Sequence, residues 1–203
     1  MNSSLFLTFA GAFFFFQVQD NVWDESNVRK LTDELQGKIL RAEREAITIL
    51  SLELSALEKR PEAVYHAIKY LQSIRSIKAV PVLCERLVHE PKCLQLMNST
   101  DTPGELIRFP AAGALVGIGE ASIDELLMRI GATDTAIPYR SVAFTVMEAL
   151  VGKERVLETV DRFQNRVKES QKFLDDPRRK EFAAVDQKRL EAFKAEFKKR
   201  WKL

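Results

Sequence analysis

Histidine and cysteine are scarce in this chain. Its 203 residues contain two of each, namely His66, His89, Cys84 and Cys93. A structural zinc site needs four Cys or His ligands, and neither a CxxC pair nor an HExxH motif is present. The sequence therefore predicts no metal site, and we expect no cofactor.

Phosphate-binding loops and nucleophile motifs are also missing. A dinucleotide fingerprint follows a strand and opens a helix, and a P-loop ends in Gly-Lys-Ser/Thr. Here Gly113, Gly117 and Gly119 fall inside or at the end of an apolar helical segment. There is no Gly-x-Ser-x-Gly elbow, and no cysteine lies next to a histidine base. We therefore expect no catalytic residues and predict that the protein is not an enzyme.

An excess of charge of one sign is absent from the chain as a whole but present at its end. The formal net charge is +2, with 31 Lys and Arg against 29 Asp and Glu. Residues 178–203 hold ten basic and four acidic residues, a net charge of +6, so the preceding residues carry −4. With 46% hydrophobic and 30% charged residues, the composition is that of a soluble globular protein long enough to form its own core.

The longest hydrophobic run lies near the N-terminus. Residues 5–16, LFLTFAGAFFFF, are uncharged, which fits a signal-peptide core and is too short to span about 30 Å of hydrocarbon. No Lys or Arg precedes Arg29, however, and no small-x-small triplet follows the phenylalanines. We predict that residues 1–20 are a signal peptide or N-terminal anchor of an exported protein (periplasmic, secreted or membrane-anchored). The alternatives are an uncleaved helix that packs on the body or holds a membrane surface, and a cytoplasmic location.

From residue 26 onward, apolar residues recur at helical spacing. One stripe runs through residues 26–60 and fits one long helix or an antiparallel pair: Val28, Leu31, Leu35, Ile39, Ala42, Ala46, Leu50, Leu54 and Leu57. Shorter apolar helices with brief breaks follow in residues 61–90, 107–130 and 138–167. Ser122 and Glu125 have the spacing of a capping box. Since no segment has the alternation of a strand with turn signals at both ends, the sequence predicts an all-α protein.

These three segments resemble HEAT-like repeats or the related armadillo and PBS-lyase type. The first reads Ala67-x-x-x-Leu71-x-x-Ile74 and then Ala79-Val80-Pro81-x-Leu83-x-x-x-Leu87. The second reads Ala111-Ala112-x-x-Leu115-x-x-Ile118-Gly119 and then Ile123-x-x-Leu126-x-x-x-Ile130. The third keeps Ala143, Val146 and Leu150 but lacks the Pro and the small residue that begin the second helix.

The resemblance covers residues 61–168, and its motifs are degenerate. It implies a short right-handed stack of antiparallel helix pairs, a HEAT-like α-α superhelix. Because the ends of such a stack expose apolar surface, we expect the helices at 26–60 and 178–201 to cap it. We therefore divide the chain into residues 1–20, a helical repeat domain over 21–176, and a basic amphipathic helix over 177–203 that packs on the repeats.

Two features are candidate sites. If the protein is exported, Cys84 and Cys93 can close a small disulfide, because Pro91 ends the helix between them; two buried free thiols are the equal alternative. The last helix is a candidate membrane or partner contact through Phe193, Phe197, Lys198, Lys199, Arg200 and Trp201. The alternative is a cap with a solvated basic face. Nucleic acid is disfavoured, since nothing arranges these residues to read bases.

The resemblance implies a non-catalytic scaffold for protein–protein interaction that uses its row of second helices, near residues 79–89, 122–131 and 153–168. The alternatives are a helical-repeat enzyme, lyase-like or metal-dependent, and a membrane-surface adaptor that uses the basic C-terminal helix. Some helical-repeat di-iron hydroxylases bind metal through several His-Glu dipeptides, but His89-Glu90 occurs once. A pocket where His89, Glu90 and other carboxylates converge would favour the enzyme, and an open, uniformly charged groove would favour the scaffold.

Overall fold

The chain forms two compact units, residues 1–42 and residues 43–203. The computed structural model describes residues 8–9, 12–13, 25–91, 104–132, 136–170 and 185–202. Predictions that concern Cys93, most of the loop at 90–105 and the segment before the last helix lie outside these residues. The architecture is all-α, as the sequence predicts. The one extended pairing among the described residues joins two strands of two residues each.

That pairing belongs to the first unit. Strand β1 (Thr8–Phe9) runs antiparallel to β2 (Ala12–Phe13), with Thr8 opposite Phe13 and Phe9 opposite Ala12. These four residues of the apolar run are extended, not helical. The signal peptide or anchor at 1–20 stays a prediction.

Helix α1 (Glu25–Leu50) is continuous through Gly37, so the predicted stripe from Val28 to Leu50 lies on one long helix, and its last two members, Leu54 and Leu57, lie on the next helix. Its first part belongs to the first unit and its last part to the second. In the second unit, Ala46 and Leu50 are buried, and the Ser76 hydroxyl donates to Glu43 Oε1 at 2.6 Å. The short helix α2 (Leu54–Leu57) follows.

Three helix pairs make up most of the described part of the second unit. The first joins α3 (Pro61–Ser73) to η1 (Ile77–Ala79) and α4 (Val80–Glu85). The second joins α6 (Pro110–Ile118) to η3 (Glu120–Ser122) and α7 (Ile123–Ala132). The third joins α8 (Ile137–Val151) to η4 (Lys153–Arg155) and α9 (Val156–Ser170). Helix α5 (Gly104–Arg108) packs against α6 and α8.

A residue with positive φ and a single turn of 3₁₀ helix connect the two helices of every pair. Each first helix has Pro in its first turn, where the missing N–H breaks no helical hydrogen bond. Gly119 (φ 100°) and Gly152 (φ 79°) directly precede the 3₁₀ turn, whereas Ser76 lies between Arg75 (φ 50°) and η1. Glycine adopts this backbone without a Cβ clash, whereas Arg75 adopts it at a cost of about 1 kcal/mol. Gly119, which the sequence places at the end of a helical segment, follows the last residue of α6, and Gly152 follows the last residue of α8 in the same way.

Ser122 is the last residue of η3 and directly precedes α7. Its buried hydroxyl donates to the Leu115 carbonyl oxygen at 3.1 Å and so ties the turn to the end of α6. The capping box that pairs Ser122 with Glu125 stays a prediction.

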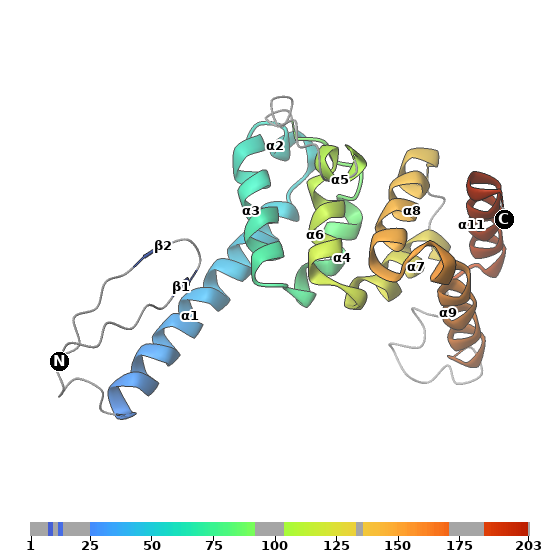
Figure 1. The fold of residues 1–203 in the computed structure, drawn as a ribbon. Coiled ribbons are helices and arrows are strands. Elements are labelled where there is room, and N and C mark those ends of the chain that lie inside the picture. The colour runs from blue at the N-terminus through green and yellow to red at the C-terminus, as the bar shows by residue number, and fades with distance from the viewer. Residues whose placement is uncertain are drawn as a thin grey trace. The chain divides into compact units, whose positions relative to one another are not determined.

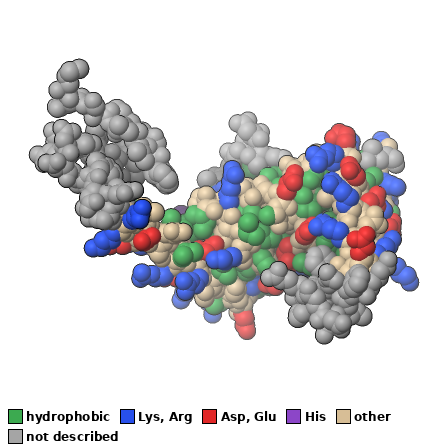
Figure 2. All heavy atoms as spheres, turned by 90° about the horizontal axis from the view of Figure 1, so that it is seen from below, with side chains coloured by type: hydrophobic (Ala, Val, Ile, Leu, Met, Phe, Trp, Pro, Cys, Tyr) green, Lys and Arg blue, Asp and Glu red, His purple; other side chains and the backbone are tan. Residues whose placement is uncertain are grey.

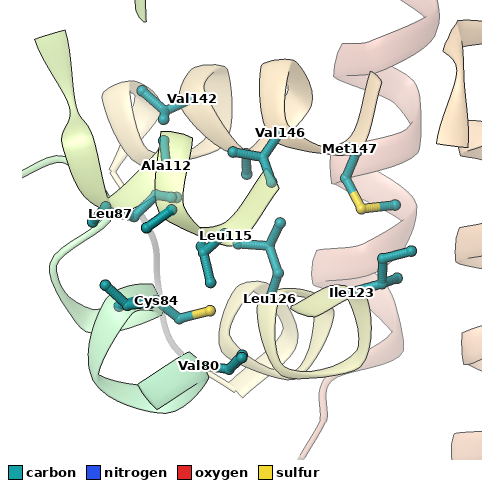
Figure 3. Packing of buried hydrophobic residues seen from close by; sticks show 14 of the residues in the cluster. Val80, Cys84, Leu87, Ala112, Leu115, Ile123, Leu126, Val142, Val146 and Met147 are labelled. Carbon is teal, nitrogen blue, oxygen red and sulfur yellow. The ribbon is translucent and has the colours of Figure 1, made fainter. Parts of the chain in front are cut away.

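The core lies between the first helices and the second helices. Helix α6 contacts α3 and α8, while α7 contacts α4 and α9 (Figure 1). Figure 3 shows Leu115 of α6 pointing toward Cys84 of α4 and Leu126 of α7. The same four positions are buried in each pair, counted from the first residue of its second helix: Val80, Leu83, Cys84 and Leu87; Ile123, Leu126, Leu127 and Ile130; Val156, Thr159, Val160 and Phe163. In the first pair the fourth of these, Leu87, follows the end of α4.

Helix α11 (Gln187–Trp201) packs against α7 and α9. Asp186 caps its N-terminus by accepting a hydrogen bond from the backbone N–H of Lys188 at 2.8 Å. Phe193 and Phe197 are fully buried, with ring centroids 4.4 Å and 5.5 Å from that of Phe144 on α8. The aromatic stripe of this helix is therefore part of the core.

Candidate functional site

The larger of two pockets described by the structure is an open groove of about 580 Å³ on the second and third helix pairs. One side comes from η3 and the start of α7, and the other from the end of α8, η4 and α9. The lining residues are Glu120, Ala121, Ile123, Asp124, Val151, Arg155, Thr159, Arg162, Asn165, Arg166 and Glu169. Seven of these eleven residues fall in two of the three ranges that the sequence predicts for partner binding, 122–131 and 153–168.

An arginine occupies the same position in all three second helices, six residues after the first. Arg86 donates through Nε to the Leu50 carbonyl oxygen (3.0 Å) and through Nη2 to that of Leu52 (2.7 Å), so it satisfies carbonyls at the end of α1. Arg129 forms an ion pair with Glu85 of the preceding second helix (3.1 Å). In both cases the guanidinium contacts a segment that lies earlier in the chain.

The third arginine, Arg162, has no ion-pair partner on another helix within the described ranges. The position equivalent to Glu85 in the second pair is Met128, which carries no charge. Arg162 instead forms a long ion pair of 3.8 Å with Glu158 of its own helix and a weak hydrogen bond of 3.4 Å to the Thr159 hydroxyl, and its side chain is 56% exposed. Because an exposed pair at this distance is worth at most a few tenths of a kcal/mol, the Arg162 guanidinium remains available to a ligand in the groove.

Two further arginines line the groove. Arg155, in η4, is exposed and makes no ion pair with any residue that the structure describes. Arg166 binds Asp124 through two hydrogen bonds, Nη1 to Oδ2 at 2.7 Å and Nη2 to Oδ1 at 2.5 Å, and so links α9 to α7. Three arginines and three acidic residues line the groove, so it is not uniformly charged. Figure 2 shows the same mixture of signs over the part of the surface nearest the C-terminal helices.

The second pocket, of about 370 Å³, contains the residues that the enzyme hypothesis requires. His89, Glu90, Glu85 and Glu58 line it together with Leu54, Leu57, Pro61, Arg86, Val88 and Pro91. Burial, and then the Arg86 charge, lower the pKa of His89, and its buried Nε2 has no hydrogen-bond partner among the described residues.

Two of the three carboxylates of this pocket pair with arginines instead of converging on His89. Glu90 accepts from Arg108 Nε at 2.7 Å, and Glu85 pairs with Arg129. Within the described ranges, no three His, Cys, Asp or Glu side chains come together in a way that would hold a metal ion. The pocket therefore offers a neutral imidazole without an assembled acid–base or metal constellation.

The candidate contacts on the C-terminal helix divide into two sets. Phe193 and Phe197 are in the core, and Trp201 is half-buried beneath Lys153, whose Nζ lies 4.1 Å from its ring centroid. Arg200 donates to the Ser141 hydroxyl at 3.1 Å. The exposed members of the set are therefore cations: Lys198, Lys199 and Arg200. In the described part of the chain, no helix has both the length and the hydrophobicity that a membrane span requires.

Cys84 is buried at the contact of α4, α6 and α7 and carries a free thiol. Burial raises the pKa of this thiol. Its backbone carbonyl accepts a buried hydrogen bond from the Tyr139 hydroxyl at 3.0 Å, which connects the first pair to the third. Cys93 lies outside the described residues.

Sequence reasoning did not single out Arg155, Arg162 or Arg166. The signal was present in the alignment of the second helices, where arginine follows the first helical residue by six in each. Comparisons of the chain with protein-family models, with curated proteins and with solved structures give no match. Any functional conclusion therefore depends on the residues themselves.

Proposed function

We propose that the protein is a non-catalytic, HEAT-like scaffold that binds a protein partner along its second helices. The shared turn and the shared burial pattern of the three pairs support their interpretation as HEAT-like repeats that form a right-handed stack. The observation that carries the function is the groove across α7 and α9, in which Arg155 forms no ion pair with any described residue and Arg162 forms only the 3.8 Å pair with Glu158.

The proposed ligand is an extended peptide segment of the partner with acidic side chains. A volume of about 580 Å³ accommodates a few residues, and the open, charged lining suits a solvated peptide better than a buried apolar molecule. Arginine is enriched at binding surfaces because its planar guanidinium binds a carboxylate through two hydrogen bonds. Arg166 already makes this interaction with Asp124, so Arg155 and Arg162 are the residues that would bind the partner.

The test compares two charge reversals of equal size in the full chain. The groove variant is Arg155→Glu with Arg162→Glu, and the control is Lys198→Glu with Lys199→Glu on α11. Tagged proteins are recovered from the native host with their bound proteins, which are quantified by mass spectrometry. We expect a partner that is lost with the groove variant and retained with the control. A partner set unchanged by the groove variant, or lost equally from both, would refute the proposal.

The same pair of variants separates the scaffold from the membrane-surface alternative. If α11 holds an anionic bilayer, the control variant loses binding to vesicles that contain phosphatidylserine, since each cation near the surface contributes about 1 kcal/mol. The scaffold proposal predicts weak vesicle binding that neither variant changes, because Phe193 and Phe197 are unavailable to insert.

The proposal includes export of the protein, because the uncharged apolar run at residues 5–16 fits a signal-peptide core. Measuring the intact mass of the protein from its native host decides whether residues 1–20 are removed. A mass that includes these residues, in a cytoplasmic fraction, would refute export.

A further inference from the structure

The first part of helix α1 carries an apolar face that is about half exposed. Leu31, Leu35 and Ile39 lie on one stripe and are 53%, 50% and 47% exposed. The same stripe continues into the second unit, where Ala46 and Leu50 are 5% and 0% exposed. Three large aliphatic side chains at successive turns of one helix face are costly to leave in water, at about 25 cal/mol per Å² of apolar surface.

The spacing of this face is symmetric about Leu35. Leu31 and Ile39 lie four residues to either side, and Ala42 lies seven residues beyond Leu35, as Val28 precedes it by seven. A second copy of the helix that runs antiparallel, centred on Leu35, therefore places apolar residues opposite apolar residues in every layer. Leu35 faces Leu35 of the second copy, and Leu31 faces its Ile39. Steps of three, four and four residues average about 3.67 per turn, so the stripe stays in register along nearly straight helices.

The charges beside the stripe select the antiparallel orientation. At about 100° per residue, Glu34 and Lys38 flank the stripe on one side, while the uncharged Thr32 and Gln36 flank it on the other. In an antiparallel pair, like flanks meet, so Lys38 of each copy lies beside Glu34 of the other. In a parallel pair, the charged flank would face the uncharged one and no ion pair would form.

We propose that residues 31–39 of α1 form the contact of an antiparallel homodimer, with Leu35 on its two-fold axis. The occupant of the apolar face is a second copy of this chain, because the face is complementary to itself in both spacing and charge. This interface is separate from the groove on α7 and α9, and it does not depend on the proposed function.

The first experiment measures the mass of the full chain in solution by light scattering after size-exclusion chromatography. We expect twice the 23.2 kDa chain mass for the wild type at micromolar concentration. Leu35→Lys places two like charges at the centre of the contact and yields the monomer mass. The control, Leu40→Lys, changes an exposed leucine of the same helix that lies off the stripe, and it leaves the dimer intact. Circular dichroism confirms that both variants keep their helical content.

The second experiment tests the orientation. Glu34→Lys and Lys38→Glu each place like charges together in the antiparallel pair, so each weakens the dimer, and the two changes combined restore it. A parallel pair predicts no effect of the single reversals on dimerisation. A monomeric wild type, equal effects of Leu35→Lys and Leu40→Lys, or a combined reversal that fails to restore the dimer would each overturn the proposal.

Discussion

Replacement of Gly131 by alanine tests the packing of α11 on α7. The glycine is buried in the last turn of α7, and a Cβ at this position would overlap Cγ1 of Val185. The chain is held close there because the backbone N–H of Asp186 donates to the Gly131 carbonyl oxygen at 3.0 Å. Val185 is 3% exposed and β-branched, so it has little freedom to move away.

Two effects of opposite sign determine how much Gly131→Ala changes the free energy of unfolding. Alanine favours a helix over glycine by about 1 kcal/mol, whereas overpacking a buried site costs about 1–3 kcal/mol. We expect Gly131→Ala to lower the free energy of unfolding by up to about 2 kcal/mol. At about 2–4 °C per kcal/mol for a chain of this size, the Tm falls by up to about 8 °C. Thermal and urea denaturation followed by circular dichroism measure the change.

A double-mutant cycle with Val185→Ala measures the energetic cost of the overlap between a Cβ at position 131 and the Val185 side chain. In the wild type this substitution removes two buried methyl groups and costs about 1.6 kcal/mol. In the Gly131→Ala background it also removes the overlap, so its cost falls by about 1–3 kcal/mol. Gly37→Ala is the matched control, because a Cβ there meets no atom within 4 Å and only the helix propensity changes. Effects that add within about 0.5 kcal/mol would refute the packing described for Gly131 and Val185.

Three further predictions concern buried polar groups. Tyr139→Phe removes the donor to the Cys84 carbonyl, and it should lower the free energy of unfolding by about 1–3 kcal/mol, measured by urea denaturation; an unchanged midpoint would contradict the bond. Because burial raises the Cys84 pKa and closes access to the thiol, iodoacetamide should label this residue only in urea, as peptide mapping will show; rapid labelling of the native protein would contradict its burial. The pKa of His89 is lowered from 6.5, so below that pH the unfolded chain binds a proton that the folded protein does not. Stability should therefore fall as pH drops below 6.5, and His89→Gln should flatten this slope in denaturation curves recorded across pH.

The helices were predictable because local rules place them. Apolar spacing predicted the three pairs, and the sequence placed Gly119 at the end of a helical segment, where the structure has a positive φ. The turn at Arg75 carries no such signal, because a positive φ is uncommon for arginine and the residue type does not predict it. The hydrogen bond from Ser122 to the Leu115 carbonyl was not predictable either, because it depends on how the turn folds back onto the end of α6.

The candidate site was harder to predict, because it depends on which elements meet. Phe193 and Phe197 have the spacing of a membrane-facing stripe and of a core stripe alike, and only the position of Phe144 decides between them. The groove likewise joins residues about one repeat apart, such as Asp124 and Arg166. No pattern within a single helix contains that information.

The position of α11 has a consequence for how the protein opens. This helix contacts both α7 and α9, and its phenylalanines also pack on α8, so three helices from two pairs share one covering element. In a stack of helix pairs, each pair normally contacts only its neighbours, and the pairs at the ends unfold first. Here α11 packs over the end of the stack nearest α9, so we expect the second and third pairs to unfold as one cooperative unit. Local unfolding should therefore start with α3 and α4. The groove on α7 and α9 should keep its shape while the first pair opens and closes.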